Sequence, residues 1–346
     1  MRVVAAMSGG VDSSVVAGLL LEQGHEVIGV HMKLHDVEEG EAGHCCGLDD
    51  AMDARMVADK LGIPFYVMDL REAFRKAVMD DFAENYKAGR TPNPCVRCNG
   101  VLKFRVLLQR AKALGASHLA TGHYAKVTPE GGLFRAVDHH KDQSYFLFPA
   151  ARSAFQQTLF PLGGMTKDEV RAHARRLNLI TSSKPDSQEV CFIPDDDHTR
   201  FVKEHLGNPD AGGEIVDEEG NILGHHDGYF RYTIGQRRGL GVAVGHPLYV
   251  LKIQAASKRV VVGPADRLFE QGLRASGMNW FRKPRPDEPV MARIRHNGGL
   301  IPATVEGDDP VHIRFQAPAR AIAPGQAVVL YSGDEVLGGG WIDAAL

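Results

Sequence analysis

The segment Ser8-Gly-Gly-Val-Asp-Ser-Ser14 constrains the fold most, because it joins a short apolar run to an amphipathic one. The run 2–7 has the pattern of a strand, and 13–22 has that of a helix. Two glycines let a backbone approach an anion closely, and a helix N-terminus favours negative charge. The order of strand, glycine-rich loop and helix therefore predicts an anion-binding loop on an open α/β sheet.

This loop differs from two other phosphate-binding motifs. It lacks the Gly-Lys-Ser/Thr of a P-loop and the spaced glycines of a dinucleotide-binding fold. We interpret it as a pyrophosphate cradle, in which Ser8, Asp12 and the serines after it present side chains to the anion. An ordinary Gly-Ser turn with Asp12 as helix cap is the alternative.

Apolar runs alternate with amphipathic stretches through the first 200 residues, as in βαβ units. We expect elements at 2–7, 13–22, 26–32, 49–61, 65–69, 72–87 and 117–121. Glycine becomes denser later, with 21 in the last 146 residues against 17 in the first 200. Alternating β patterns follow at 258–263, 290–296, 311–316 and 327–331. The prediction is an α/β chain with a doubly wound parallel sheet over 1–200, a small middle domain over 201–268 and an antiparallel β-barrel over 269–346.

The composition excludes several classes of protein. A chain of 346 residues with 44% hydrophobic and 24% charged residues is typical of a globular protein. Its longest apolar run, 15–21, is far shorter than the roughly 20 residues that cross a bilayer. The first apolar stretch is also too short for a signal-peptide core, so we expect a cytoplasmic protein without membrane partners. The net charge of −3 leaves room for a local basic face.

Five cysteines are too few for a disulfide scaffold in a chain of this length. Pro92 and Pro94 disfavour helix before Cys95, so Cys98 should lie near the first turn of the next helix. With Lys103 nearby, such a thiol is expected to have a lowered pKa and to act as a nucleophile.

Cys191 is a candidate partner for sulfur exchange with that thiol. The alternatives are that Cys191 is a buried, inert thiol, and that the Cys-x-x-Cys pair is half of a zinc site, although no second pair follows at finger-like spacing. We interpret Cys45 and Cys46 as a loop pair without a role.

Six segments together resemble the tRNA-specific 2-thiouridylase family, which belongs to the PP-loop ATP pyrophosphatase (adenine nucleotide alpha hydrolase-like) superfamily. The segments are 8–14, 91–94 with 98–99 and 103–104, 121–125, 141–146, 186–187 with 191–193, and 233–237. The resemblance covers essentially the whole chain. It implies ATP-dependent 2-thiolation of the wobble uridine of tRNA: adenylation of the 2-oxygen, then transfer of sulfur with release of AMP and pyrophosphate.

The resemblance also implies roles for single residues. Cys98 would be the nucleophile, and Cys191 would carry a persulfide. ATP, with Mg²⁺, would be bound by Ala6, Met7, Ser8, Gly9, Gly10, Val11, Asp12, Ser13, Met32 and Gly122. The tRNA would be contacted by Asn93, Pro94, Cys95, His123, Lys141, Asp142, Gln143, Arg295, His296 and Gln326. We also expect a cationic strip that binds tRNA phosphates, made of Arg231, Arg237, Arg238, Arg282, Lys283, Arg285, Arg293 and Arg295.

Cys95 stands where many members of that family carry an aspartate with an acid–base role. Either the proton leaves by another path, or Cys95, Cys98 and Cys191 hold a [4Fe-4S] cluster. The expected partners are tRNA and a sulfur donor, either a cysteine desulfurase or a relay protein, and the chain is expected to act as a monomer. Two alternative functions are a PP-loop ligase for a small carboxylate or purine, and a non-catalytic protein that binds tRNA or metal.

Overall fold

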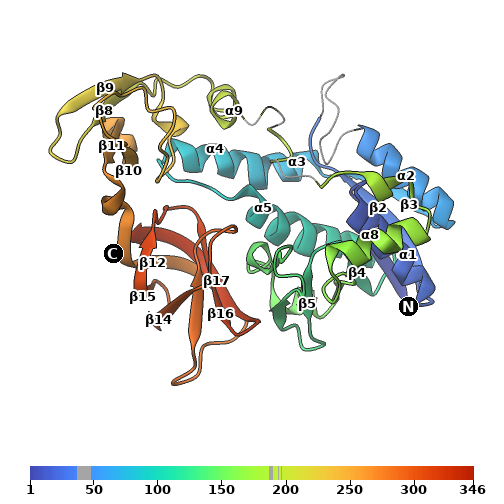
Figure 1. Ribbon diagram of the computed structural model, residues 1–346. Coiled ribbons are helices and arrows are strands. Elements are labelled where there is room, and N and C mark those ends of the chain that lie inside the picture. Colours follow the sequence, from blue (N-terminus) through green and yellow to red (C-terminus); the bar gives the residue numbers. More distant parts are fainter. Residues whose placement is uncertain (37–47, 187–189, 194, 196) are drawn as a thin grey trace. The chain divides into compact units, whose positions relative to one another are not determined.

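The computed structural model describes residues 1–36, 48–186, 190–193, 195 and 197–346, as Figure 1 shows. The chain divides into two compact units. The first comprises 1–78, 95–196 and 334–336, and the second comprises 79–94, 197–333 and 337–346. Across the described ranges, every helix is too short or too polar to cross a bilayer. The expected domain boundaries near 200 and 268 stay predictions.

A five-stranded parallel sheet forms the centre of the first unit, in the order β3-β2-β1-β4-β7. Its strands are β1 (Arg2–Ala6), β2 (Glu26–Lys33), β3 (Phe65–Asp69), β4 (His118–Ala120) and β7 (Thr158–Leu159). The sequence predicts the first four of these to within one or two residues. The chain moves outward from β1 to β3 and then crosses to the other side of β1. The strand order therefore reverses between β1 and β4, and open α/β sheets bind ligands at such a point.

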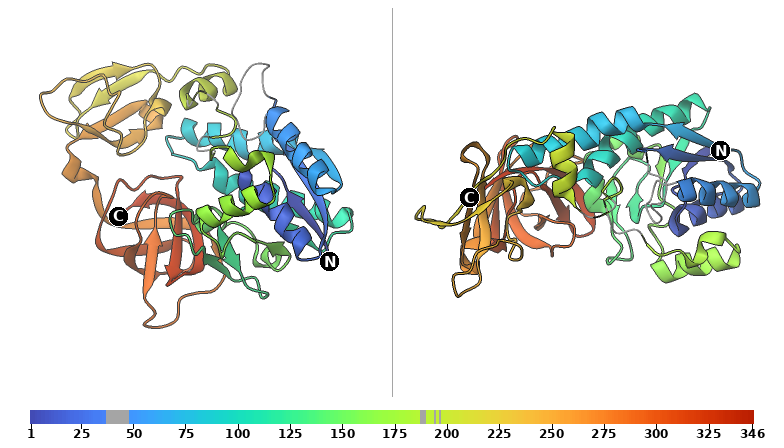
Figure 2. Two further views of the ribbon diagram at one scale, coloured as in Figure 1. Left: turned by 45° about the vertical axis from the view of Figure 1, so that its right-hand side comes forward. Right: turned by 90° about the horizontal axis from the view of Figure 1, so that it is seen from above.

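Helices cover both faces of this sheet. The helices α1 (Val11–Glu22) and α8 (Lys167–Arg176) lie on one side, and the helical run from α5 (Pro94–Arg97) to α6 (Leu108–Ala113) lies on the other (Figure 2). The first side also carries α2 (Leu48–Leu61). The core beneath α1 is aliphatic, with Val3, Val15 and Leu20 fully buried. The doubly wound parallel sheet is thus confirmed.

Two helical segments of the first 113 residues contain π-helix. Where the sequence predicts one helix over 72–87, the structure has α3 (Arg71–Phe74), the π-helix η1 (Arg75–Met79) and α4 (Asp80–Lys87). The second segment has the π-helix η2 (Cys98–Leu107) between α5 and α6. The remaining elements of the first unit are β5 (Ala125–Val127), β6 (Leu133–Arg135), η3 (Ser144–Phe146), α7 (Arg152–Phe155) and η4 (Ile180–Ser183). Phe134 of β6 pairs with Glu335.

The second unit contains one open sheet and one barrel. The open sheet has the order β10-β11-β8-β9. Its elements, with their flanking helices, are α9 (His198–His205), β8 (Gly213–Val216), β9 (Ile222–His226), η5 (Tyr229–Arg231), β10 (Tyr249–Gln254), η6 (Ala255–Ser257), β11 (Arg259–Gly263) and η7 (Ala265–Leu268).

The barrel follows in the order β12-β15-β14-β13-β16-β17, and pairing of β12 with β17 closes it. Its strands are β12 (Phe269–Trp280), β13 (Val290–Arg293), β14 (Ile301–Glu306), β15 (Val311–Arg320), β16 (Ala327–Ser332) and β17 (Glu335–Ala345). Alternate residues of β15, such as Val311 and Ile313, are buried in the barrel core. The predicted antiparallel β-barrel is confirmed.

Candidate active site

The glycine-rich loop lies between β1 and α1, as the sequence predicts. Gly9 has φ +81°, and a Cβ there would lie 2.2 Å from the carbonyl oxygen of Asp50, so only glycine fits. The loop is closed by its own serines: the Ser8 amide donates to Oγ of Ser13 at 3.1 Å, and Ser13 donates to the Gly10 carbonyl at 3.2 Å. The loop therefore has a fixed shape before any anion binds.

Two residues that the resemblance assigns to ATP lie at neighbouring strand ends. Gly122 follows β4, and a Cβ at this position would lie 3.0 Å from the amide nitrogen of Ser13 and 3.2 Å from Cβ of Asp12. Met32 lies near the end of β2, opposite Met68 in the register. The predicted ATP-binding residues thus come from the ends of β1, β2 and β4, where the strand order reverses.

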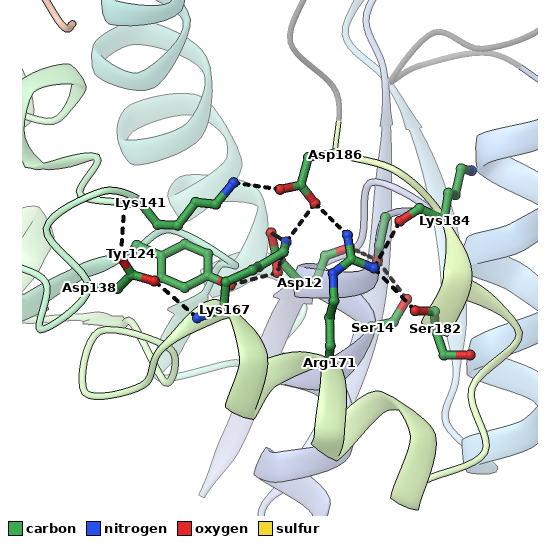
Figure 3. A network of polar contacts seen from close by, with 12 residues as sticks. Asp12, Ser14, Tyr124, Asp138, Lys141, Lys167, Arg171, Ser182, Lys184 and Asp186 are labelled. Carbon is green, nitrogen blue, oxygen red and sulfur yellow. Dashed lines mark hydrogen bonds and ion pairs between the residues drawn. The ribbon is translucent and has the colours of Figure 1, made fainter.

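A network of ion pairs lies beside this loop (Figure 3). Nζ of Lys167 lies 2.8 Å from Oδ1 of Asp12 and 2.8 Å from Oδ1 of Asp186. The Tyr124 hydroxyl donates to Asp12 at 2.9 Å, and Lys141 pairs with Asp186 at 2.7 Å. We call this set the Asp12–Asp186 network, and it comprises Asp12, Tyr124, Lys141, Lys167, Arg171 and Asp186.

The network brings a cluster of cations to the edge of the loop. Burial opposes ionisation of Asp186, but hydrogen bonds from Lys141 and Lys167 lower the pKa of this carboxyl to about 2. Lys167 is nine-tenths buried at the first turn of α8, which begins with a capping box formed by Thr166 and Glu169. Sequence reasoning missed Lys167 and Arg171, because the capping signal there predicts the start of a helix and not a site. Tyr124 lies in the segment 121–125, but the resemblance implies no role for its hydroxyl.

The three described cysteines lie within the first unit as thiols. Cys98 is 9% exposed at the start of η2. Burial raises the pKa of Cys98 to about 12, Lys103 opposes this rise, and the charges of Cys191 and Cys95 add to it. The predicted lowering of this pKa is therefore wrong, because burial outweighs the lysine.

Cys95 and Cys98 lie further along their helix than expected. The helix begins at Pro94, not after Cys95, because proline is well tolerated at a first helical position. Cys95 is exposed as a whole residue, yet burial of its sulfur and the charge of Cys191 raise its pKa to about 11. Cys45 and Cys46 lie outside the described residues.

His35 is the neighbour of Cys191. Burial lowers the pKa of this imidazole, but a hydrogen bond with Cys191 and the thiolate charge outweigh that effect and raise it. When it is protonated, this imidazole is a local counter-charge for a thiolate at Cys191. The sequence has no pattern that would link these residues.

His123 is buried between aromatic rings and polar groups. Its ring lies 5.8 Å from that of Phe104 and 5.9 Å from that of Phe160. Nδ1 lies 2.7 Å from Oγ1 of Thr121, and Nε2 lies 3.4 Å from Nζ of Lys103. Burial and, second, the Lys103 charge hold the pKa of His123 well below its usual value. The ring is therefore neutral at pH 7.

The resemblance assigns the segment 141–143 to tRNA contact. In the structure, the side chains of this segment bind groups of the first unit. Asp142 is 1% exposed, and its carboxylate accepts hydrogen bonds from the amide and hydroxyl of Ser144. The side chain of Gln143 accepts from the Tyr124 amide at 3.0 Å. A direct contact between tRNA and Asp142 would require this carboxylate to be uncovered.

In the second unit, two predicted tRNA contacts bind backbone carbonyls. Arg295 donates to the carbonyls of Ala321 at 2.6 Å and Ile234 at 3.1 Å. Gln326 donates at 3.1 and 3.2 Å to the two carbonyls of residues 91 and 92, just before the partly exposed Asn93 and Pro94. His296 is half-buried. The side chains of Arg295 and Gln326 therefore already hold the backbone of neighbouring loops.

The expected cationic strip is partly neutralised within the second unit. Arg282 pairs with Glu288 at 2.6 Å, and Arg231 pairs with Asp227 at 2.5 Å. Arg237 and Arg238 are exposed. Arg285 is exposed as well, so these three strip residues are the best placed to reach a phosphate.

No three His, Cys, Asp or Glu side chains in the described part of the chain are arranged to hold one metal ion. Cys95, Cys98 and Cys191 are all described and form no site for a single metal ion, and the three-thiolate cluster considered from the sequence stays a prediction. The Asp12 carboxylate is taken up by Lys167 and Tyr124. These side chains therefore form no protein cage for Mg²⁺.

The fold and this site together define an α/β nucleotide-binding protein with a PP-loop at the strand reversal and two β domains. Three family models match: the tRNA methyl transferase HUP domain over 1–195, the tRNA methyl transferase PRC-barrel domain over 199–264 and the aminomethyltransferase beta-barrel domain over 270–342. The tRNA-specific 2-thiouridylase MnmA of Geobacter metallireducens is 51% identical over 100% of this chain and 97% of its own length. That of Geotalea uraniireducens is 51% identical over 100% and 96%. The chain belongs to the tRNA-specific 2-thiouridylase family, which confirms the resemblance.

Among solved structures, a 4-thiouridine synthetase–RNA complex with bound ATP aligns over 60% of this chain and 50% of that chain. Its sequence identity is 16% and its TM-score is 0.36, which is too low to carry an argument.

Proposed function

We propose that this protein replaces the 2-oxygen of the wobble uridine of tRNA with sulfur, at the expense of ATP. The observation that carries the proposal is that Cys98 and Cys191, which are 93 positions apart in the chain, belong to the same compact unit as the PP-loop. A site for nucleotide activation and a pair of thiols are what such a reaction needs. Membership of the family supports the same conclusion.

The first step activates the base. The 2-oxygen of uridine attacks the α-phosphorus of ATP, the bond to the β-phosphate breaks, and pyrophosphate leaves. The loop 8–13 and the first amides of α1 would bind the phosphates. Lys167 and Arg171 would supply positive charge where negative charge develops on the departing pyrophosphate. Gly122 would keep the loop in place, because it packs against Ser13 and Asp12.

The second step transfers sulfur. A persulfide on Cys191 attacks C2 of the activated uridine through its terminal sulfur, and AMP leaves with the former 2-oxygen. The Cys98 thiolate then attacks Sγ of Cys191 and breaks the S–S bond, so that the electron pair stays on the base sulfur. The products are 2-thiouridine and a Cys98–Cys191 disulfide. A two-electron thiol reductant must reset this disulfide, and a persulfide donor must then reload Cys191.

Mg²⁺ would neutralise the pyrophosphate when bound with ATP. Since the described carboxylates form no cage for it, the ion would be held largely by the phosphates, as is usual for Mg²⁺. No step is assigned to an iron–sulfur cluster. We place the reaction in the cytoplasm as a monomer, with a cysteine desulfurase or relay protein as sulfur donor, because the substrates of the proposed reaction meet there.

The target uridine would be flipped out of the anticodon loop toward the cysteines. The predicted contacts of the base and its neighbours are Asn93, Pro94, Cys95, His123, Lys141, Asp142 and Gln143. Those of the more distant tRNA are Arg295, His296 and Gln326. Arg237 and Arg238 would bind phosphates.

Two measurements on single-cysteine variants test this function. C98S and C191S should each yield no 2-thiouridine in nucleosides from treated tRNA, as measured by mass spectrometry, while pyrophosphate release with unmodified tRNA continues. C45S is the matched control and should thiolate at the wild-type rate. Thiolation by C98S at the wild-type rate would show that the cysteine assignment is wrong. Wild-type protein that releases no pyrophosphate with tRNA would refute the adenylation step.

A further inference from the structure

The π-helix η2 gives Cys98 a specific neighbour. Backbone hydrogen bonds in a π-helix join residues five apart, and at the end of η2 the Leu108 amide donates to the Lys103 carbonyl. Cys98 and Lys103 are themselves five residues apart, so their side chains leave the same side of the helix, one turn from each other. In an α-helix the same two residues would diverge by about 140°. The π-helix therefore brings the lysine to the cysteine.

Lys103 is held in this place by His123. The ring of His123 is neutral and 8% exposed, and its two nitrogens have different partners. Nδ1 lies 2.7 Å from the Thr121 hydroxyl, and Nε2 lies 3.4 Å from Nζ of Lys103. An ammonium has no lone pair, so Lys103 donates and Nε2 accepts. Nδ1 then carries the proton and donates to Thr121, which fixes the ring.

The two other described cysteines oppose the ionisation of Cys98. Burial is the largest effect, and thiolates at Cys191 on its loop and Cys95 on α5 act in the same direction. Lys103 is the cation that acts the other way. His35 faces Cys191. Lys103 is therefore the cation that we expect to stabilise a thiolate at Cys98.

We propose that Lys103, oriented by its contact with His123, is a positioning residue that stabilises the Cys98 thiolate for its attack on Cys191. This inference rests on the proposed function. The Cys98 thiol gives its proton to water, and the thiolate forms beside the ammonium. When the thiolate attacks Sγ of Cys191, the charge passes to the base sulfur, and Lys103 is unchanged. His123 thus orients the Lys103 ammonium, in addition to any contact that it makes with the base.

Alkylation of Cys98 by iodoacetamide across a pH series tests the thiolate directly. The full-length protein is alkylated first and then digested. Because trypsin cleaves after Arg97, Cys95 and Cys98 fall on different peptides, and mass spectrometry measures the alkylation of each thiol separately. K103M should shift the Cys98 profile upward by about one pH unit, which is about a tenfold lower rate at a given pH. K103R should restore most of the rate. K112M, at an exposed lysine on α6, is the matched control and should leave the profile unchanged.

Activity measurements separate the inference from the proposed function. K103M should release pyrophosphate at the wild-type rate but form 2-thiouridine about tenfold more slowly, because only the second step uses the Cys98 thiolate. Thermal unfolding shows whether K103M is folded, and K103R provides the test if it is not. An unchanged Cys98 alkylation profile in folded K103M would overturn the inference. Wild-type protein that forms no 2-thiouridine would overturn the proposed function, whatever K103M does.

Discussion

Lys167 and Asp12 are 155 positions apart in the chain, yet Nζ of Lys167 lies 2.8 and 2.9 Å from the two carboxylate oxygens of Asp12. The same ammonium contacts Asp186. One buried cation thus joins the start of α1, the start of α8 and the segment before Cys191. If phosphates bind to the loop as we propose, this cation is already in place beside them.

Replacing Lys167 should abolish base activation. We expect K167M to reduce pyrophosphate release in the presence of tRNA by about 100-fold or more, because it removes a preorganised cation from the departing pyrophosphate. K167R should retain part of the rate. K76M, at an exposed lysine of η1, is the control. Folded K167M with a wild-type rate of release would exclude this role.

Protonation of Asp186 should make the free energy of unfolding depend on pH in the acidic range. Its pKa is lowered to about 2, so its contribution is present above the ordinary value near 4 and is lost as the pH falls from about 4 toward 2. We expect D186N to lower the free energy of unfolding by about 2 kcal/mol at pH 7. Urea unfolding should show this difference narrowing below pH 4. D59N, at an exposed aspartate, is the control, and a pH-independent difference would contradict the prediction.

Gly122 should be needed for ATP binding. A Cβ at this position would press on Ser13 and Asp12 at 3.0 to 3.2 Å, and overpacking of this kind displaces backbone. We expect G122A to raise the KM for ATP about tenfold. G164A adds the same methyl group where nothing lies within 4 Å and should have no effect. Equal KM values for the two variants would show that the loop tolerates the methyl group.

Arg237 and Arg238 should bind tRNA phosphates. Affinity for tRNA falls with salt, and a plot of log affinity against log salt concentration gives the slope. We expect this slope to be shallower by about one to two in R237A/R238A. Each lost phosphate contact reduces the slope by about 0.7 to 0.9. R267A removes an exposed arginine that pairs with Glu218 at 2.8 Å and should leave the slope unchanged. Identical slopes for the double variant and wild type would place the phosphate contacts elsewhere.

Local patterns predicted much of this fold. The run 65–69 forms β3 with the expected bounds, since a short apolar segment between a helix-ending glycine and a helix start has few other conformations. The PP-loop was predictable because its glycines and serines are adjacent in the chain. The barrel was predictable because apolar and polar residues alternate along strands that have one buried face.

Other features have no local signal. The helix over 94–113 contains a π-helix, which depends on packing and not on the propensities of its residues. Asp142 has the character of a surface residue, but the fold buries its carboxylate among donors from Ser144 and from the Ala136 amide after β6. The pKa of Cys98 was predicted with the wrong sign, because the charge of Lys103 is visible in the sequence and the depth of burial is not.

The sequence by itself determined the order of strands and helices, the anion-binding loop and the family, because each of these is written in neighbouring residues. Only the tertiary structure decided which distant groups meet, such as Lys167 with Asp12 and Lys103 with His123. These meetings depend on how the chain crosses the sheet and on how deeply each side chain is buried. Burial and long-range proximity set the charges of the site, and neither is a property of a short stretch of sequence.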